Sequence, residues 1–468
     1  MNVYDADYIF IPEGMVERIL DAEGTVLWET AESGQFYITN DDTQQVTVSV
    51  VGRSYAAPAL SLEVSDDGIT WTTLGTTSST PLDIVLPVGG KKYLRSTSAK
   101  AWYDSRINYG NKFSSTGKFG AHGNIMTLLG YNTLKGYDCY QMFKECIYLT
   151  SMPILPITTL AEYCYYAMFH GCKALTNVHA LPANTLAPYC YYSMFYGCTS
   201  LVTAPALPAT TLTDYCYDYM FFGCTSLVTA PALPATTLAS HCYSHMFGNC
   251  SLLTSAPALP ATTLAPYCYG EDINGGMFAA CTSLISAPEL PATTLAEGCY
   301  QSMFSGCTSL TTAPELPATT LAEDCYMQMF AACTSLISAP ELPATTLVTD
   351  CYMQMFYGCT SLTTAPNLPA TSLVYRCYHE MFRNCTGLTV APELPATILV
   401  SSCYWGMFDG CTSLEEIKCN ATDISVNSCV HVWVRNVAAS GTFYKNPSMS
   451  SWTTGVSGIP SGWTVQDL

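Results

Sequence analysis

Hydrophobic and polar positions follow two different patterns along this chain. Between residues 35 and 104, apolar and polar residues alternate within five short segments, 45–51, 62–65, 70–74, 83–86 and 92–95. A period of two is typical of strands that bury one face. The Asp66-Asp67-Gly68 turn between two of the segments indicates a hairpin. We predict an all-β domain at 31–104, most readily an immunoglobulin-like β-sandwich.

From about residue 134 the pattern becomes a repeat of about 26 residues, which the cysteines mark. The first cysteine series comprises Cys139, Cys164, Cys190, Cys216, Cys242, Cys268, Cys299, Cys325, Cys351, Cys377, Cys403 and Cys429. A second series follows most of these by eight residues, at Cys172, Cys198, Cys224, Cys250, Cys307, Cys333, Cys359, Cys385 and Cys411. A fixed period of this length predicts a stacked array of structural units.

Residues 212–237 illustrate one unit. Apolar residues recur at steps of four, four, four and three, at Leu212, Cys216, Met220, Cys224 and Leu227. This spacing predicts a helix with one buried face, on which the recurring Tyr and Phe stack between neighbouring units. A strand of about three or four residues should follow, because the next segment ends in a Pro-x-Leu-Pro motif.

The repeated motif Met-Phe-x-Gly-Cys-Thr-Ser-Leu-x-x-Ala-Pro resembles the leucine-rich repeats of the BspA-like class, found in gut Bacteroidetes, their phages and some parasites. The resemblance covers about 134–429 and implies an α/β solenoid of eleven units. We place the repeats at 134–428, with a cap on the N-terminal side at 105–133 and a C-terminal cap at 429–468. Both caps are atypical in sequence, as the ends of such arrays generally are.

Residues 1–30 are predicted to form an attachment segment with a small hairpin around Ala22-Glu23-Gly24. This segment is similar to short N-terminal elements of phage tail and appendage proteins. It has neither a basic stretch nor an apolar stretch at its start, so no signal peptide is expected.

The charge balance restricts the possible partners. The chain has 468 residues, with 17 Lys and Arg against 36 Asp and Glu, for a net charge of −19. Nucleic-acid binding and docking on anionic membranes both require clustered cations, so neither is expected. No apolar run reaches the roughly 20 residues that span a bilayer, so we expect no membrane insertion.

Three kinds of chemistry can be weighed against a purely structural interpretation. The 24 cysteines are most simply small buried hydrophobes with free thiols, with disulfides as the alternative. His241 and His245 have the spacing of metal ligands on a helix, but helical phase turns both outward, so no metal is predicted. The 270–276 insertion lacks the ligand pattern of a calcium loop.

No catalytic motif is present, and Glu289, Glu315, Glu341 and Glu393 form a repeated column typical of a solvated face. We therefore expect neither an enzyme nor a cofactor.

The positions that vary between units are the candidate binding residues. They are rich in aromatic residues, which supply large contact area at low entropic cost. On helical phase they should lie opposite the buried stripe; packing between units is the alternative interpretation. They comprise Tyr163, Tyr166, His170, Tyr189, Tyr192, Tyr196, Tyr215, Tyr219, Phe222, His241, His245, Tyr357, Arg376, His379, Arg383 and Trp405.

The resemblance and these positions together predict a structural and adhesive protein. Our first hypothesis is a virion tail fibre or receptor-binding appendage of a phage. Its N-terminal region would bind other virion proteins, and its solenoid would bind a bacterial surface protein or glycan. The second hypothesis is a cell-surface adhesin of a gut bacterium, and the third is a carbohydrate-active enzyme.

Overall fold

The computed structural model describes residues 34–52, 57–98, 102–104, 109–271, 275–449 and 452–468, and the backbone of four short strands nearer the N-terminus. The chain divides into two compact units. The first comprises Met1–Leu134 together with Tyr148–Ile157 and Asn177–Ala180, and the second comprises the remaining residues.

The N-terminal strands of the first unit form two small antiparallel pairs. Strand β1 (Val3–Tyr4) pairs with β2 (Phe10–Ile11). Strand β3 (Arg18–Leu20) pairs with β4 (Val26–Glu29). The second pair flanks the Ala22-Glu23-Gly24 sequence, where we predicted a hairpin turn; the turn itself lies outside the described residues.

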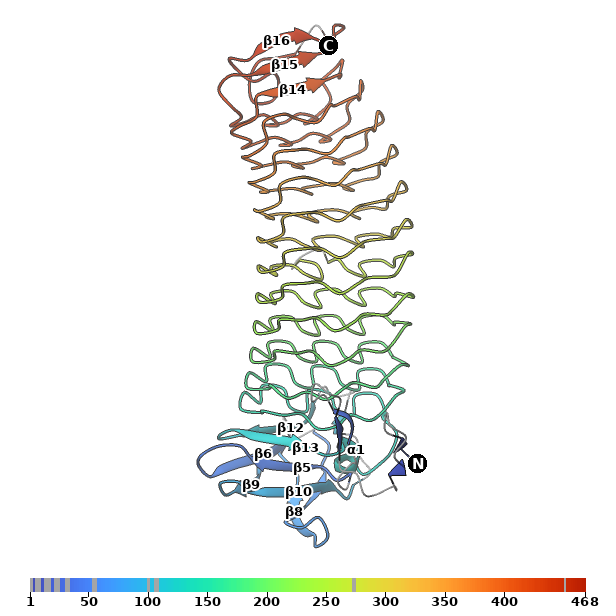
Figure 1. The fold of residues 1–468 in the computed structure, drawn as a ribbon, viewed down its shortest axis with the longest axis vertical. Helices are drawn as coiled ribbons and strands as arrows, with labels where there is room; N and C mark the ends of the chain where they lie inside the picture. The colour runs from blue at the N-terminus through green and yellow to red at the C-terminus, as the bar shows by residue number, and fades with distance from the viewer. Residues whose placement is uncertain are drawn as a thin grey trace. The chain divides into compact units, whose positions relative to one another are not determined.

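Two antiparallel sheets follow (Figure 1). The five-stranded sheet has the order β13 (Phe119–His122), β5 (Tyr37–Asn40), β10 (Lys91–Ser96), β7 (Ser61–Ser65) and β8 (Thr72–Thr76). The four-stranded sheet has the order β11 (Tyr103–Asp104), β12 (Tyr109–Ser115), β6 (Val46–Gly52) and β9 (Leu82–Leu86).

The alternation seen in the sequence produces the core between these sheets. Along β6, every second residue is buried, beginning with Val46. The rings of Phe36 and Phe113 meet at 6.0 Å, and Trp102 stacks on Phe113 at 5.6 Å. The domain was predicted to end at residue 104, but β12 and β13 pair with β6 and β5. Residues 109–122 therefore belong to the sheets rather than to a separate cap.

A short helix, α1 (Ile125–Leu129), follows the last strand of the five-stranded sheet. The Asn124 side chain accepts a hydrogen bond from the Met126 N–H, and Gly130 ends the helix in a left-handed conformation. Parallel bridges then join Phe119 to Leu149 and Asn124 to Ile154 within the first unit. Phe119 of β13 and Asn124, which precedes α1, thus pair with residues of the Tyr148–Ile157 segment.

The repeats are coils of turns, and the predicted helix is wrong. In the unit 212–237, Tyr215, Tyr219 and Gly223 have positive φ angles of 56°, 56° and 70°. Within the unit, the Met220 N–H donates to the Tyr217 carbonyl at 3.1 Å, whereas the Tyr217 N–H donates to Cys242 in the next unit at 3.1 Å. Alternate amides therefore bond within and between units, unlike those of an α-helix.

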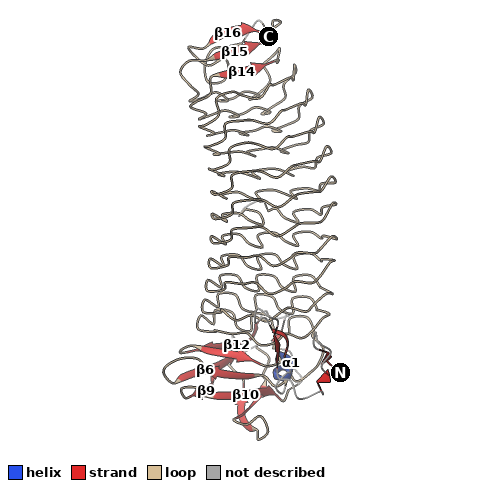
Figure 2. Cartoon of the chain, in the orientation of Figure 1, coloured by secondary structure: helices blue, strands red, loops and turns tan. Residues whose placement is uncertain are grey.

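The period of the pattern explains the error. Apolar residues spaced by four drift about 40° per step around a helix of 3.6 residues per turn, so they do not share one helical face for long. A turn that repeats every four residues keeps them aligned. The α/β class is thus incorrect for the repeats, which contain no helix among their described residues (Figure 2).

The predicted strands of three or four residues are also mostly absent. Single parallel bridges join the units instead, as between Thr203 and Thr229. Among the described residues after 134, regular strands occur only near the C-terminus, where β14 (Glu416–Cys419), β15 (Thr442–Lys445) and β16 (Thr464–Asp467) form a parallel sheet. The prolines of the Pro-x-Leu-Pro segments lack an N–H group, which limits each ladder to a residue or two.

The core of the second of the two compact units is a set of columns, in which equivalent side chains of successive repeats stack on one another. In the motifs that start at Cys164 through Cys403, the first cysteine, Tyr, Met, Phe, second cysteine and Leu are buried. Tyr191 stacks on Tyr217 at 5.8 Å, and Phe195 stacks on Phe221 at 5.6 Å, as the sequence predicted. Such pairs each contribute about 0.5–1.5 kcal/mol beyond the burial of their area.

All 24 cysteines are buried free thiols, as the simpler interpretation of the sequence predicted. Those of the second series donate to a carbonyl of the preceding unit, as Cys224 Sγ does to Phe195 at 3.1 Å. Burial raises the pKa of Cys224 to about 12, so the thiol is protonated at physiological pH. Cysteine here provides a small apolar side chain that is also a weak donor.

One cysteine lies in a different column from the one predicted. The Cys139 N–H donates to Cys164, as the Tyr165 N–H does to Cys190. Cys139 therefore occupies the tyrosine column, and Asp138, fully buried, occupies the first cysteine column. This shift accounts for the first spacing in the series being one residue short.

Candidate functional site

Most of the variable positions lie half-buried in ladders that run from unit to unit. We call one column the outer tyrosine ladder: Tyr137, Tyr163, Tyr189, Tyr215, His241 and Tyr267. Its successive rings stack at 4.6, 4.7, 4.6, 4.5 and 5.1 Å. Two shorter ladders comprise Tyr140, Tyr166 and Tyr192, and His170, Tyr196 and Phe222.

The stacking determines which parts of these rings a partner can contact. Their faces contact neighbouring rings, so these side chains pack between units. Because stacking covers the ring faces, we infer that a partner would meet the ring edges and hydroxyl groups. Burial raises the pKa of Tyr163, Tyr189 and Tyr215, so their phenols stay protonated at physiological pH. The ladder therefore carries a row of neutral hydroxyl groups.

Two of the predicted surface residues are instead buried. His245 has no exposed surface, and His379 has 7%. His245 lies three residues after a first-series cysteine, in a column whose members Ala167 and Ser302 are also buried. Helical phase predicted the wrong side for this column because the coil repeats every four residues. His379 is covered in part by Trp405, whose ring lies 4.9 Å away.

His245 belongs to a buried polar cluster that the sequence did not predict. Its Nε2 lies 3.2 Å from the Tyr219 hydroxyl, and the two rings stack at 4.0 Å. Its Nδ1 lies 3.6 Å from Asp218 Oδ1 and 3.9 Å from Glu271 Oε2. The Ser244 hydroxyl donates to the Gly270 carbonyl at 2.7 Å.

Burial dominates the protonation of this cluster. It raises the pKa of Asp218 to about 9, with a further contribution from Glu271, and lowers the pKa of His245 to about 3. Both groups are therefore uncharged near pH 7, and their 3.6 Å contact is not an ion pair. Asp218 Oδ1 has no hydrogen-bond partner among the described residues.

The described residues include no group of three or more His, Cys, Asp and Glu side chains arranged to hold a metal ion. His241 lies at the edge of the cluster, with its Nε2 3.8 Å from Glu271 Oε2. Through its contacts with Tyr219, Asp218 and Glu271, His245 joins its own repeat unit to the units on either side.

The remaining predicted residues lie in the C-terminal half of the repeats and are mostly engaged in pairs. Arg376 Nη1 lies 3.3 Å from Asp350 Oδ2. Arg383 pairs with the carboxylates of Glu380 and Asp409, and its guanidinium lies 5.8 Å from the Tyr357 ring centroid. The most accessible predicted residue here is Trp405, which is 36% exposed.

A ladder of polar side chains in this half was missed. We call it the amide ladder: Ser302, Gln328, Gln354 and Glu380. Each side chain hydrogen-bonds to its counterpart in the next unit, ending with the Gln354 Nε2 donation to Glu380 Oε2 at 2.5 Å. Its members all lie three residues after a first-series cysteine, so an alignment of the units would have revealed it.

Comparison with known proteins identifies the repeats. A family model described as a BspA type leucine-rich repeat region, with six copies, matches residues 139–274, 269–389 and 326–444. The chain belongs to this family. The repeats of this BspA-type protein have the Leu of each motif buried, as the spacing of the apolar residues predicted.

A solved structure is also similar, a leucine-rich repeat protein from Bacteroides ovatus ATCC 8483. It is 18% identical, with 72% of this chain and 88% of that chain covered and a TM-score of 0.37. No curated protein matches. Within the described part of the chain, no helix has the length and apolar character needed to cross a bilayer.

Proposed function

We propose that this BspA-type protein is a non-enzymatic adhesive protein that binds a bacterial surface through the outer tyrosine ladder. The single observation that carries the proposal is the row of half-buried, stacked rings with protonated hydroxyl groups. Stacking holds the rings rigid, so a partner that bonds to their edges loses little further side-chain entropy. The chain belongs to a repeat family that is associated with adhesion, and this membership supports the same function.

We further propose a phage virion as the setting, with the protein as a tail fibre or receptor-binding appendage. The repeats would form a solenoid of eleven units, and the two sheets would form an immunoglobulin-like sandwich that binds other virion proteins. The similarity of the first thirty residues to phage appendage elements supports this setting. A bacterial cell-surface adhesin is the second candidate, which family membership favours.

The test of the binding face removes hydroxyl groups and keeps the stack. In the triple variant Tyr163→Phe, Tyr189→Phe, Tyr215→Phe, three edge hydrogen bonds of about 0.5–1.5 kcal/mol each are lost. We expect binding to target cells, measured with labelled protein, to weaken at least about tenfold. Circular dichroism and Tm should stay at the parent values.

A control variant removes exposed side chains elsewhere in the repeats. Ile285 and Ile337 are 57% and 55% exposed and lie outside the tyrosine ladder. The Ile285→Ala, Ile337→Ala variant should bind as the parent does. Parent-like attachment by the tyrosine variant would refute the ladder as the binding face. Antibody labelling of intact phage particles, compared with bacterial cells, separates the two settings.

A further inference from the structure

Charge is distributed unevenly along the repeats. Residues 174–375 contain eleven Asp and Glu and no Lys or Arg. Arg376, the first cation after this stretch, pairs with Asp350. The stretch itself therefore supplies no Lys or Arg to its exposed carboxylates.

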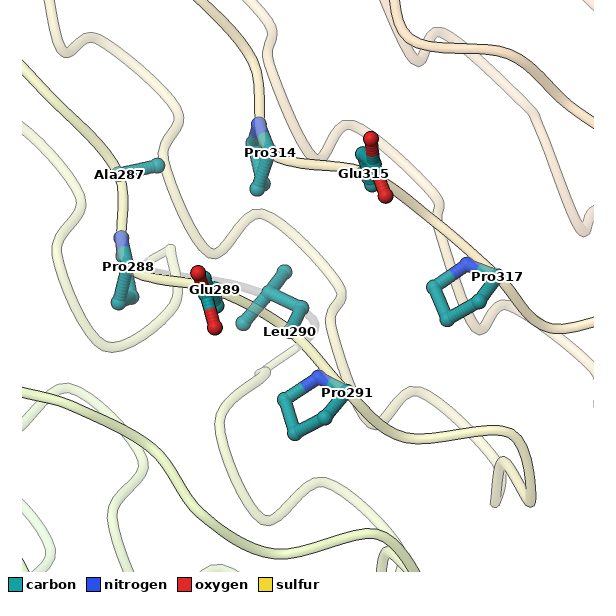
Figure 3. A pocket seen from close by; sticks show the side chains of 8 residues that line it. All are labelled: Ala287, Pro288, Glu289, Leu290, Pro291, Pro314, Glu315 and Pro317. Atoms are coloured by element: carbon teal, nitrogen blue, oxygen red, sulfur yellow. The ribbon is translucent and has the colours of Figure 1, made fainter.

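Two of these carboxylates lie in a groove between neighbouring units (Figure 3). The groove encloses about 500 Å³. We call it the proline groove, and it is lined by Ala287, Pro288, Glu289, Leu290, Pro291, Pro314, Glu315 and Pro317. Glu289 and Glu315 are exposed and occupy equivalent places between two prolines of their segments (Figure 3). The sequence alone predicted only a solvated column of carboxylates here.

The backbone of the groove has an excess of acceptors. Each Pro-Glu-Leu-Pro segment carries four carbonyls but only two N–H groups, because proline has none. Among the backbone hydrogen bonds of the described residues, none joins 288–291 to 314–317. The walls are thus apolar proline rings, and the polar groups that face a partner are mainly carboxylates and carbonyls.

We propose that the proline groove binds an extended, cationic segment of a partner protein, rich in Lys or Arg. The aliphatic stems of such side chains pack on proline rings, and their charged ends donate to the carboxylates and carbonyls. Glu341 continues the column in the next unit, so a segment that runs along the stack meets a third carboxylate. Exposed ion pairs are individually weak, so the affinity is modest and decreases with salt.

The chain supplies its own control sequence for this site. Earlier units have the same Pro-x-Leu-Pro motif with alanine at the central position, at Ala206, Ala232 and Ala258. These alanines are exposed, as are Glu289 and Glu315. The double variant Glu289→Ala, Glu315→Ala therefore produces a segment that this fold already contains, and it should fold as the parent does.

The experiment measures the binding of a fluorescent oligo-lysine peptide to the full chain by anisotropy. We expect binding at low salt that weakens toward about 150 mM salt. An oligo-glutamate peptide should not bind. The Glu289→Ala, Glu315→Ala variant should bind the lysine peptide at least about tenfold more weakly, a loss of about 1.4 kcal/mol, with unchanged Tm.

A charge-matched control tests whether the groove matters. Glu162 and Glu323 are exposed carboxylates outside it, and the Glu162→Gln, Glu323→Gln variant removes the same net charge. We expect it to change the affinity less than about twofold, because exposed charges at a distance are screened. An equal loss in both variants would indicate diffuse attraction and overturn the proposal. Absence of peptide binding, or full displacement by equimolar Mg²⁺, would overturn it as well.

Discussion

The aromatic region (residues 137–267) and the polar region (residues 298–435) of the repeats share one core and differ on their outer columns. In both, the buried Tyr and Phe columns stack at closely similar distances, such as 5.7 Å for Phe195–Phe169 and 5.8 Å for Phe330–Phe356. Outside the core, rings stack in the first region, whereas amides and ions pair in the second. The buried columns and turns thus support two different kinds of surface.

The two outer surfaces respond differently to solution conditions. Stacked rings are insensitive to salt, whereas the polar region contains charged groups close together. Burial and the neighbouring Asp350 raise the pKa of Asp324 to about 6. Arg435 donates to Asp409 through Nη2 at 2.5 Å and through Nε at 3.0 Å. The polar region is therefore the part of the array where pH and ionic strength should act.

The largest expected effect tests whether the two regions share a core. Phe195→Ala in the aromatic region and Phe356→Ala in the polar region should each destabilise by about 3–5 kcal/mol, because both rings are fully buried in the same column. Denaturant unfolding monitored by tyrosine fluorescence measures both variants. A cost below about 1 kcal/mol in only one region would show that the cores differ in packing.

The next effect sharpens the contrast on the outer columns. Asp409 is 3% exposed and pairs with Arg383 and Arg435. Asp409→Ala removes the shared carboxylate, so we expect a loss of about 2–3 kcal/mol, reduced by solvent around the half-exposed arginines. In the aromatic region, Tyr189→Ala should cost about 1 kcal/mol. Unfolding midpoints measured at low and high salt check both, and only the first loss should depend on salt.

A further effect, confined to high pH, concerns Asp218 at the buried cluster of the aromatic region. Its pKa is about 9 in the folded chain and 3.8 ordinarily, so the folded state binds the extra proton between these values. Stability from this group is therefore fully present below pH 3.8 and is lost as pH rises toward 9. Asp218→Asn should raise stability relative to the parent by about 1–2 kcal/mol at pH 9, and by less at pH 7.

Thermal unfolding between pH 7 and 9 isolates this effect. The pKa of His245 is lowered from 6.5 to about 3, so its own influence, a loss of stability as pH falls, operates only below 6.5. A variant with the same pH dependence as the parent would show that Asp218 is charged in the folded chain.

The sequence was sufficient to predict the period, the buried columns and the stacking of Tyr and Phe, because these depend on side chains that recur at fixed spacing. It did not reveal the backbone conformation, since apolar residues spaced by four are compatible both with an α-helix and with a turn that repeats every four residues. The left-handed conformation of residues such as Tyr215 could not be predicted from residue type, because tyrosine rarely adopts it.

The burial of His245 was missed for the same reason, because its predicted side depended on helical phase. The position of Cys139 was missed because the units were aligned on their cysteines. The positive φ of Tyr137, 68°, matches that of Tyr163 in the next unit, and this match gives the true alignment. The amide ladder needed only an alignment of the units, so it was accessible from sequence.

Some backbone N–H groups donate to the next unit along the chain, so each coil can complete its hydrogen bonds only after the next coil has been translated. The Tyr217 N–H finds its acceptor on Cys242, a residue translated 25 positions later. At roughly 5–20 residues per second, a nascent coil waits about one to five seconds for the carbonyls that complete it. Growth of the array is therefore directional, with each newly made coil completing the one made before it.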